Sequence, residues 1–112
     1  MEISFSSKKL AKNLSDPKDR ARTYGPTQTA KILRRLDEIA AAPSLAHLSR
    51  LPPTRCHELS QNRKGQFSVD LNHPYRLLFI PANEPIPTKP DGGIDLDLVT
   101  EVEIIEITDT HE

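Results

Sequence analysis

Two histidines, an arginine and an aspartate are the residues of this sequence best suited to chemistry. His57 lies in RCHELS, Arg76 in YRLLFI, and Asp109 and His111 in ITDTH. An imidazole can accept or donate a proton near neutral pH, and a guanidinium binds phosphoryl oxygens through paired N–H groups. Metal-independent RNA cleavage requires such a set: a base for the ribose 2′-hydroxyl, cations for the phosphorane and an acid for the leaving oxygen.

Each of these residues also has a plain structural explanation. Arg76 lies inside an apolar run, where it can form a salt bridge to Asp70 across a predicted hairpin. A lone histidine such as His57 is more often a surface or hydrogen-bonded residue than a catalyst. The sequence leaves both explanations open.

Charge is divided unevenly along the chain. Residues 1–76 contain 14 Lys or Arg against 7 Asp or Glu, and residues 77–112 contain one Lys against 9 acids, so the net charge of −1 hides a large asymmetry. The basic part can present a face to a polyanion, or the two sets can neutralise each other on one mixed surface. Charge alone does not decide between these interpretations.

Several kinds of site are missing. The sequence has no P-loop, GxGxxG, HExxH or GxSxG motif, and its only cysteine, Cys56, excludes an internal disulfide and has no neighbours spaced for zinc. We therefore expect no metal and no cofactor. The chain also has no apolar run of roughly 20 residues and no signal-peptide pattern, so we expect a cytoplasmic protein with no membrane partner.

Hydrophobic periodicity predicts a strand and two helices in the first half of the chain. Alternation in EISFS predicts a strand with Ile3 and Phe5 inward, and Ser7 can cap a short helix that ends near Asp16. A longer helix is predicted over 25–43. Its apolar stripe comprises Ala30, Ile32, Leu33, Leu36, Ile39 and Ala40, with Lys31, Arg34, Arg35 and Glu38 largely outside it.

Four strands are predicted in the second half, over 55–60, 65–71, 75–80 and 102–107. The short NHP sequence between the second and third of these predicts a tight antiparallel hairpin, and the proline-rich segment PANEPIPTKPDGG predicts a long irregular connection. The pattern indicates an α+β fold in a single domain over residues 1–112, with the N-terminal strand and two helices packed on a small, twisted antiparallel sheet.

This order of elements, with RCHELSQNRKGQFSVDLNHPYRLLF followed by EIIEITDTH, resembles the RelE/ParE toxin superfamily. It looks closest to the HigB-like branch, the plasmid maintenance system killer proteins. The resemblance implies a RelE-like fold and a toxin of a type II toxin-antitoxin system. Such a toxin is a metal-independent, ribosome-dependent endoribonuclease of messenger RNA, neutralised by a HigA-like helix-turn-helix antitoxin. The implied partners are the ribosome, messenger RNA and that antitoxin.

The resemblance also implies roles for particular residues. His57 matches the family's strand histidine, Arg76 matches the arginine of a WR or YR pair, and Asp109 and His111 match a terminal Asp-aromatic-His pattern. It implies proton transfer by His57 or His111, phosphate stabilisation by Arg76 and RNA positioning by Lys64. The candidate catalytic residues are His57, Arg76, Asp109 and His111, and the candidate RNA-binding residues are Arg63, Lys64 and Tyr75.

The chain departs from the family pattern in three places. Thr110 stands where family members have an aromatic residue that can stack on a base, and Phe67 and Tyr75 stand where Trp is usual. The chain is also slightly acidic, whereas such toxins are commonly basic. An alternative function is therefore a non-catalytic or degenerate RelE-fold module that binds an antitoxin or regulator, or a ParE-like gyrase inhibitor. A small structural protein without a site is the third hypothesis.

Overall fold

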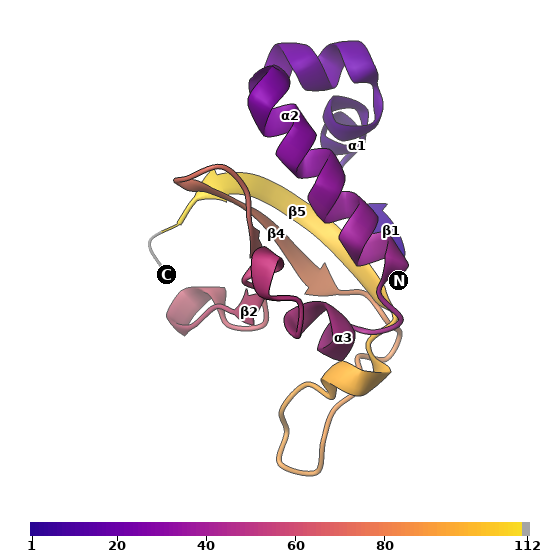
Figure 1. Ribbon diagram of the computed structural model, residues 1–112. Coiled ribbons are helices and arrows are strands. Elements are labelled where there is room, and N and C mark those ends of the chain that lie inside the picture. The colour runs from indigo at the N-terminus through magenta and orange to yellow at the C-terminus, as the bar shows by residue number, and fades with distance from the viewer. Residues whose placement is uncertain (111–112) are drawn as a thin grey trace.

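A twisted five-stranded sheet forms the body of the computed structural model, which describes residues 1–110 (Figure 1). The strand order is β1-β5-β4-β3-β2, and every neighbouring pair is antiparallel except β1 with β5. The strands are β1 (Glu2–Phe5), β2 (His57–Glu58), β3 (Phe67–Asp70), β4 (Tyr75–Pro81) and β5 (Glu101–Asp109).

The five predicted strands are all present, but the prediction of a purely antiparallel sheet is wrong. β1 runs parallel to β5, with Ile3 opposite Val102. A parallel pair needs a long crossover connection, and the helices that follow β1 begin such a connection. The predicted hairpin between β3 and β4 is confirmed: Phe67 lies opposite Phe79 and Asp70 lies opposite Arg76.

Capping residues determine where the helices begin. The Ser7 hydroxyl accepts a hydrogen bond from the Leu10 amide, and α1 (Lys8–Ser15) ends before Asp16, as predicted. Asp16 in turn caps α2 (Pro17–Ala41), because its carboxylate accepts a hydrogen bond from the Lys18 amide at 2.9 Å. The sequence analysis missed this start and placed the helix from residue 25 onward.

Glycine 25 breaks α2 into two parts. Gly25 has φ 77° and ψ 164°, a backbone conformation that is essentially restricted to glycine, and Pro26 begins the second part. The predicted helix over 25–43 therefore corresponds to this second part. A further short helix, α3 (Leu45–Ser49), capped by Ser44, was not predicted.

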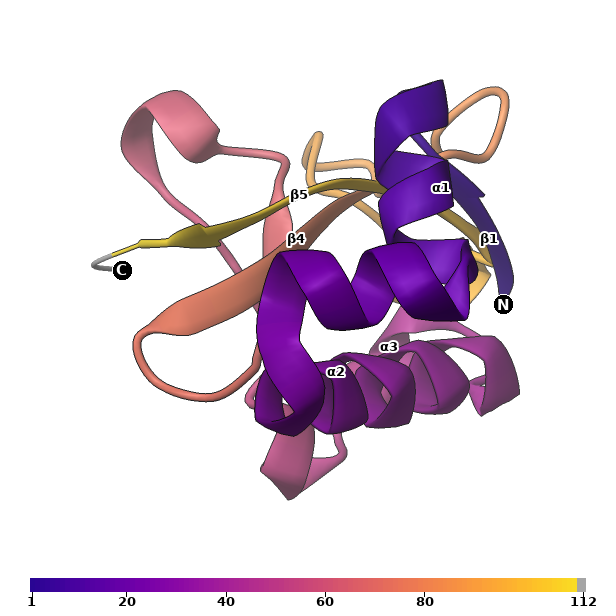
Figure 2. The same ribbon diagram turned by 90° about the horizontal axis from the view of Figure 1, so that it is seen from above.

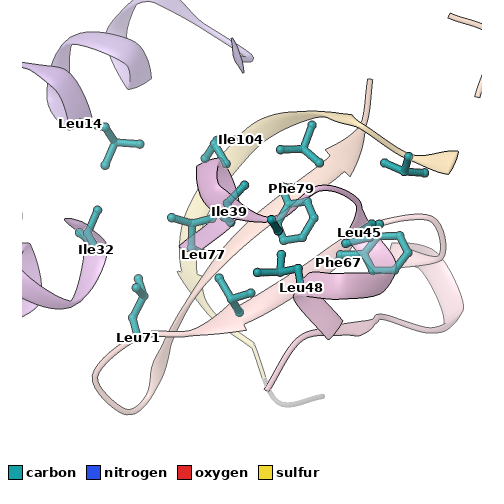
Figure 3. Packing of buried hydrophobic residues seen from close by; sticks show 14 residues of the cluster. Leu14, Ile32, Ile39, Leu45, Leu48, Phe67, Leu71, Leu77, Phe79 and Ile104 are labelled. Carbon is teal, nitrogen blue, oxygen red and sulfur yellow. The ribbon is translucent and has the colours of Figure 1, made fainter. Parts of the chain in front are cut away.

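The core lies between the helices and one face of the sheet (Figure 3). Phe67 and Phe79, which are opposite each other on β3 and β4, stack with ring centroids 5.9 Å apart. Their burial supplies much of the hydrophobic free energy, at about 1.5–3 kcal/mol for each large side chain. The helices contribute Leu14, Ile32, Ile39, Leu45 and Leu48 to this cluster.

Arg35 is buried on the core side of α2, so its predicted place outside the apolar stripe is wrong. The residue is only 4 % exposed, whereas Leu33 is 37 % exposed. Spacing explains this, because Arg35 lies three residues after Ile32 and four before Ile39, on the buried face of the helix. Its charge is compensated by three acceptors: the Asp70 carbonyl at 2.6 Å, the Pro53 carbonyl at 2.7 Å and the Glu38 carboxylate at 2.7 Å.

The loop over 59–66 lies on the other side of the sheet from α2 and α3, as Figure 2 shows. Arg63 in this loop donates a hydrogen bond to Glu106 of β5 at 3.0 Å.

Among the helices of residues 1–110, none is both long enough and apolar enough to span a bilayer.

Candidate functional site

Three of the predicted site residues meet in one hollow, which we call the hairpin pocket. Tyr75 lies opposite Asp109 and Arg76 lies opposite Thr108, so the start of β4 and the end of β5 form one rim. The β3-β4 turn forms the other. The hollow has a volume of about 360 Å³ and is lined by Asp70, His73, Tyr75, Arg76, Asp109 and Thr110, among others.

Arg76 forms a salt bridge to Asp70, so the structural explanation of this residue is confirmed. Arg76 Nε lies 3.4 Å from Asp70 Oδ1, and Arg55 Nε lies 3.1 Å from Asp70 Oδ2. One carboxylate therefore lies between two guanidinium groups. A structural role of Arg76 does not exclude a role in binding, because a guanidinium that lines a hollow can also bind an anion through charge-assisted hydrogen bonds.

One nitrogen of the Arg76 guanidinium has no hydrogen-bond partner among the residues that the structure describes. Its Nη1 atom is buried and makes no hydrogen bond to any group within residues 1–110. A buried donor without a partner is energetically costly, and charged donors form the strongest hydrogen bonds to anionic oxygens. Nη1 itself is shielded from solvent, but Arg76 supplies the guanidinium of the hairpin-pocket lining and is the group there best suited to a phosphoryl oxygen.

His57 lies outside the hairpin pocket. It is exposed on β2 and lies opposite Ser68, two residues before Asp70 on β3. Strand spacings of ~4.8 Å and a rise of ~3.3 Å per residue put its Cα about 12 Å from that of Arg76, on the same face of the sheet. His57 Nδ1 lies 3.2 Å from the Arg55 carbonyl oxygen, which can only accept. The neutral ring therefore carries its proton on Nδ1 and presents Nε2 as the basic nitrogen.

The predicted basic turn is also separate from the hairpin pocket. Arg63 is paired with Glu106, and Lys64 lines a different hollow of about 540 Å³ together with Glu58 and Asp91. Each of the two cations therefore has an acidic neighbour. Ion pairs such as Arg63 with Glu106 also join the basic and acidic parts of the sequence, which favours the mixed-surface interpretation of the charge asymmetry.

His73 is the pocket residue that the sequence analysis missed. It lies in the turn between β3 and β4, is exposed, and lines the hairpin pocket with Arg76 and Asp109. The NHP sequence was interpreted only as a turn, although the short spacing from His73 to Arg76 was visible. The other predicted histidine, His111, lies outside the described residues. His73 is therefore the imidazole that the described structure brings to the pocket.

No protein-family model matches the chain, and no curated protein matches it significantly. Within residues 1–110, no three His, Cys, Asp or Glu side chains are grouped so that they could hold a metal ion. The hairpin pocket brings together a guanidinium, two carboxylates, an imidazole and a phenol, from Arg76, Asp70, Asp109, His73 and Tyr75.

Proposed function

We propose that the protein is a toxin of the RelE/ParE superfamily, of the HigB-like branch, that cleaves messenger RNA on the ribosome without a metal. One observation carries the proposal: Arg76, Asp109 and His73 line one hollow of about 360 Å³, within the range of small ligand sites. The sequence pattern from RCHEL to YRLLF and the terminal TDTH supports the same family. A HigA-like helix-turn-helix antitoxin in the cytoplasm would hold such a toxin inactive.

The residues of the hairpin pocket suit transfer of a phosphoryl group within RNA. The 2′-hydroxyl loses its proton to a base and attacks phosphorus; its oxygen forms a new P–O bond while the bond to the 5′-oxygen breaks. Asp109, as a carboxylate, is the proton acceptor, and His73, as an imidazolium, is the donor to the leaving 5′-oxygen. Arg76 binds the phosphoryl oxygens as negative charge builds up.

His57 and the basic turn have supporting roles in this proposal. His57 shares the sheet face of Arg76 but lies about 12 Å from it by strand geometry, so it contacts RNA that extends from the pocket across β3. Arg63 and Lys64 lie in the loop over 59–66 that follows β2, and they contact the ribosome or RNA at the periphery.

Induced expression tests the proposal. The wild-type protein is expected to arrest growth and to produce new 5′ ends within translated messenger RNA after a brief pulse. Arg76→Ala is expected to abolish both effects. Arg55→Ala is the matched control, because Arg55 contacts the same Asp70 carboxylate from an exposed position outside the pocket lining. Undiminished cleavage by a double His73→Ala, Arg76→Ala variant would contradict the proposed site.

A second candidate function is a non-catalytic module of the same fold that binds an antitoxin or DNA gyrase. The pairing of cations favours it: Arg76 is paired with Asp70, Arg63 with Glu106, and Lys64 lies near Glu58 and Asp91. Surface cations that are already paired attract RNA phosphates less strongly. A DNA-damage response with intact messenger RNA after induction would distinguish the gyrase-binding version from the nuclease.

A further inference from the structure

Tyr75 separates the hairpin pocket from a second hollow, which we call the tyrosine pocket. The tyrosine pocket has a volume of about 310 Å³ and lies between α2 and the ends of β4 and β5. It is lined by Thr23, Tyr24, Gln28, Tyr75 and Ile107. Because Tyr75 lines both hollows, the two adjoin at this residue at the start of β4.

The break in α2 positions Tyr24, which lines the tyrosine pocket on the side opposite Tyr75's strand. Tyr24 is the last residue before Gly25, where the helix changes direction, and it packs partly against the core cluster. Gln28, one turn later, accepts a hydrogen bond from the Asn72 amide at 2.9 Å and donates one to the Asn72 carbonyl at 3.3 Å. These bonds fix the helix to the β3-β4 turn, so the two walls of the tyrosine pocket are held at a constant separation.

Tyr75 presents an exposed ring, whereas Tyr24 is partly buried against the core. The only aromatic pair that stacks within residues 1–110 is Phe67 with Phe79, so Tyr24 and Tyr75 do not stack on each other. Tyr75 is 47 % exposed, which is high for a large aromatic side chain. Burial raises the pKa of Tyr24 above its ordinary value of 10.0, so its hydroxyl is neutral and can donate a hydrogen bond at physiological pH.

We propose that the tyrosine pocket binds one unpaired base of single-stranded RNA whose phosphate lies in the hairpin pocket. Aromatic rings stack on any base, and the two adjoining hollows provide an anion site and a planar apolar site. Thr110 has no ring, so Tyr24 and Tyr75 supply the stacking surface from α2 and β4. Because Gln28 already uses its amide on Asn72, the pocket tolerates different bases.

The inference rests on the proposed function for its ligand, and a non-cleavable RNA tests it separately. The probe is a five-nucleotide 2′-O-methyl RNA that contains one 2-aminopurine. Its fluorescence with the protein is measured in two settings: as free RNA, and as a 2′-O-methyl, 2-aminopurine-labelled codon in programmed ribosomes. The missing 2′-hydroxyl prevents cleavage, so binding is observed whether or not the protein is a nuclease. Wild-type protein is expected to quench the 2-aminopurine emission, because the base stacks on a ring.

Two substitutions separate the ring from the hydroxyl. Tyr24→Leu is expected to weaken binding about tenfold and to reduce quenching, whereas Tyr24→Phe retains the ring and is expected to bind within about threefold of wild type. Leu98→Ala is the control, since Leu98 is 59 % exposed and outside both pockets. The chain has two tyrosines and no tryptophan, so its own emission comes only from the walls of this pocket and gives a second signal.

The outcomes distinguish the inference from the proposed function. Binding of Tyr24→Leu equal to that of wild type, or an absence of quenching by wild-type protein in both settings, overturns the base site. Quenching without any cleavage of ordinary messenger RNA overturns the nuclease but leaves the base site intact. Unfolding curves of Tyr24→Leu and Tyr24→Phe are compared first, so that a loss of fold is not mistaken for a loss of binding.

Discussion

Arg35 Nε donates a hydrogen bond of 2.6 Å to the carbonyl oxygen of Asp70, the residue whose carboxylate pairs with Arg76. A buried side chain of α2 therefore holds the strand that presents the partner of the pocket arginine. Arg35 does not line the hairpin pocket, so it is a positioning residue and acts through Asp70.

We expect Arg35→Leu to lower the free energy of unfolding by about 2–4 kcal/mol, because two carbonyls and the Glu38 carboxylate lose a buried partner. Urea unfolding measures the change. Arg34→Leu is the control: Arg34 is exposed on the neighbouring face, and its loss is expected to cost less than about 0.5 kcal/mol. Equal stabilities for the two variants would show that the Arg35 bonds contribute little.

Arg76→Lys tests whether the guanidinium itself is needed. A lysine can retain the charge beside Asp70 but cannot present paired N–H groups to a phosphate. We expect a loss of roughly 10²-fold or more in the rate of messenger RNA cleavage, as for removal of one oxyanion donor. The single-turnover rate on programmed ribosomes measures it. A rate within a factor of about three of wild type would place the phosphate elsewhere.

His73 and His57 are expected to differ in effect. His73→Ala removes the imidazole of the hairpin pocket and is expected to reduce the cleavage rate about 10²- to 10⁴-fold, as for loss of a general acid. His57 lies outside the hairpin pocket and is proposed only to contact RNA, so His57→Ala should mainly raise KM. The reverse pattern would transfer the proton-transfer role to His57.

Cys56 is expected to be unreactive in the folded protein. Burial raises the pKa of its thiol to about 12, so the fraction of thiolate at pH 8 is about one in 10⁴. A disulfide reagent should therefore react with Cys56 far more slowly in native protein than in urea. Rapid labelling of the native protein would show that the half-buried thiol is accessible and reactive.

The same pKa predicts the direction of a pH effect on stability. The folded thiol binds its proton more tightly than the unfolded thiol, whose ordinary value is 9.0. Between pH 9 and pH 12 the folded state therefore holds more protons, and stability decreases as the pH rises. Wild type should lose stability faster than Cys56→Ala above pH 9, by no more than about 1.4 kcal/mol per pH unit. If the free energy of unfolding falls with pH equally in wild type and in Cys56→Ala, the thiol has the same pKa in the folded and unfolded states.

Gly25→Ala is expected to cost about 1–3 kcal/mol of stability, because alanine is strained at φ 77° and ψ 164° even though no atom lies within 4 Å of the added carbon. Thermal unfolding measures the loss. Gly93→Ala is the control: this glycine has no positive φ, and the added carbon would lie 3.2 Å from the Asp91 carboxylate, a side-chain end that can shift, so a smaller cost is expected. A neutral Gly25→Ala would indicate that α2 can straighten, and the orientation of Tyr24 would then change with it.

Local sequence signals predicted the strands, the β3-β4 hairpin and the first helix. Alternation of apolar and polar residues defines a strand wherever one face is buried. The cap at Ser7 and the NHP turn each depend on only a few neighbouring residues, so both can be read from the sequence. The parallel pairing of β1 with β5 could not be predicted in this way, because it joins residues about a hundred positions apart and no turn fixes its direction.

The candidate site was predictable only in part, for the same reason. Arg76 and Asp109 were identified as candidates from residue type and resemblance, but their common pocket depends on the register of β4 against β5. His73 was missed because a histidine in a turn has no signal of its own until the end of β5 lies beside it. The spacing of Arg35 from Ile32 and Ile39 was visible in the sequence, but two of the three acceptors that compensate its buried charge, the Pro53 and Asp70 carbonyls, lie far along the chain and could not be predicted.

The position of β5 between β1 and β4 has a genetic consequence. A stop codon shortly before Glu101 would remove only a small share of the chain, yet it would take away the strand that joins two others and one rim of the hairpin pocket. Late nonsense alleles should therefore behave as complete losses of function. For the toxin proposed above, such alleles would allow the coding sequence to be kept in a host.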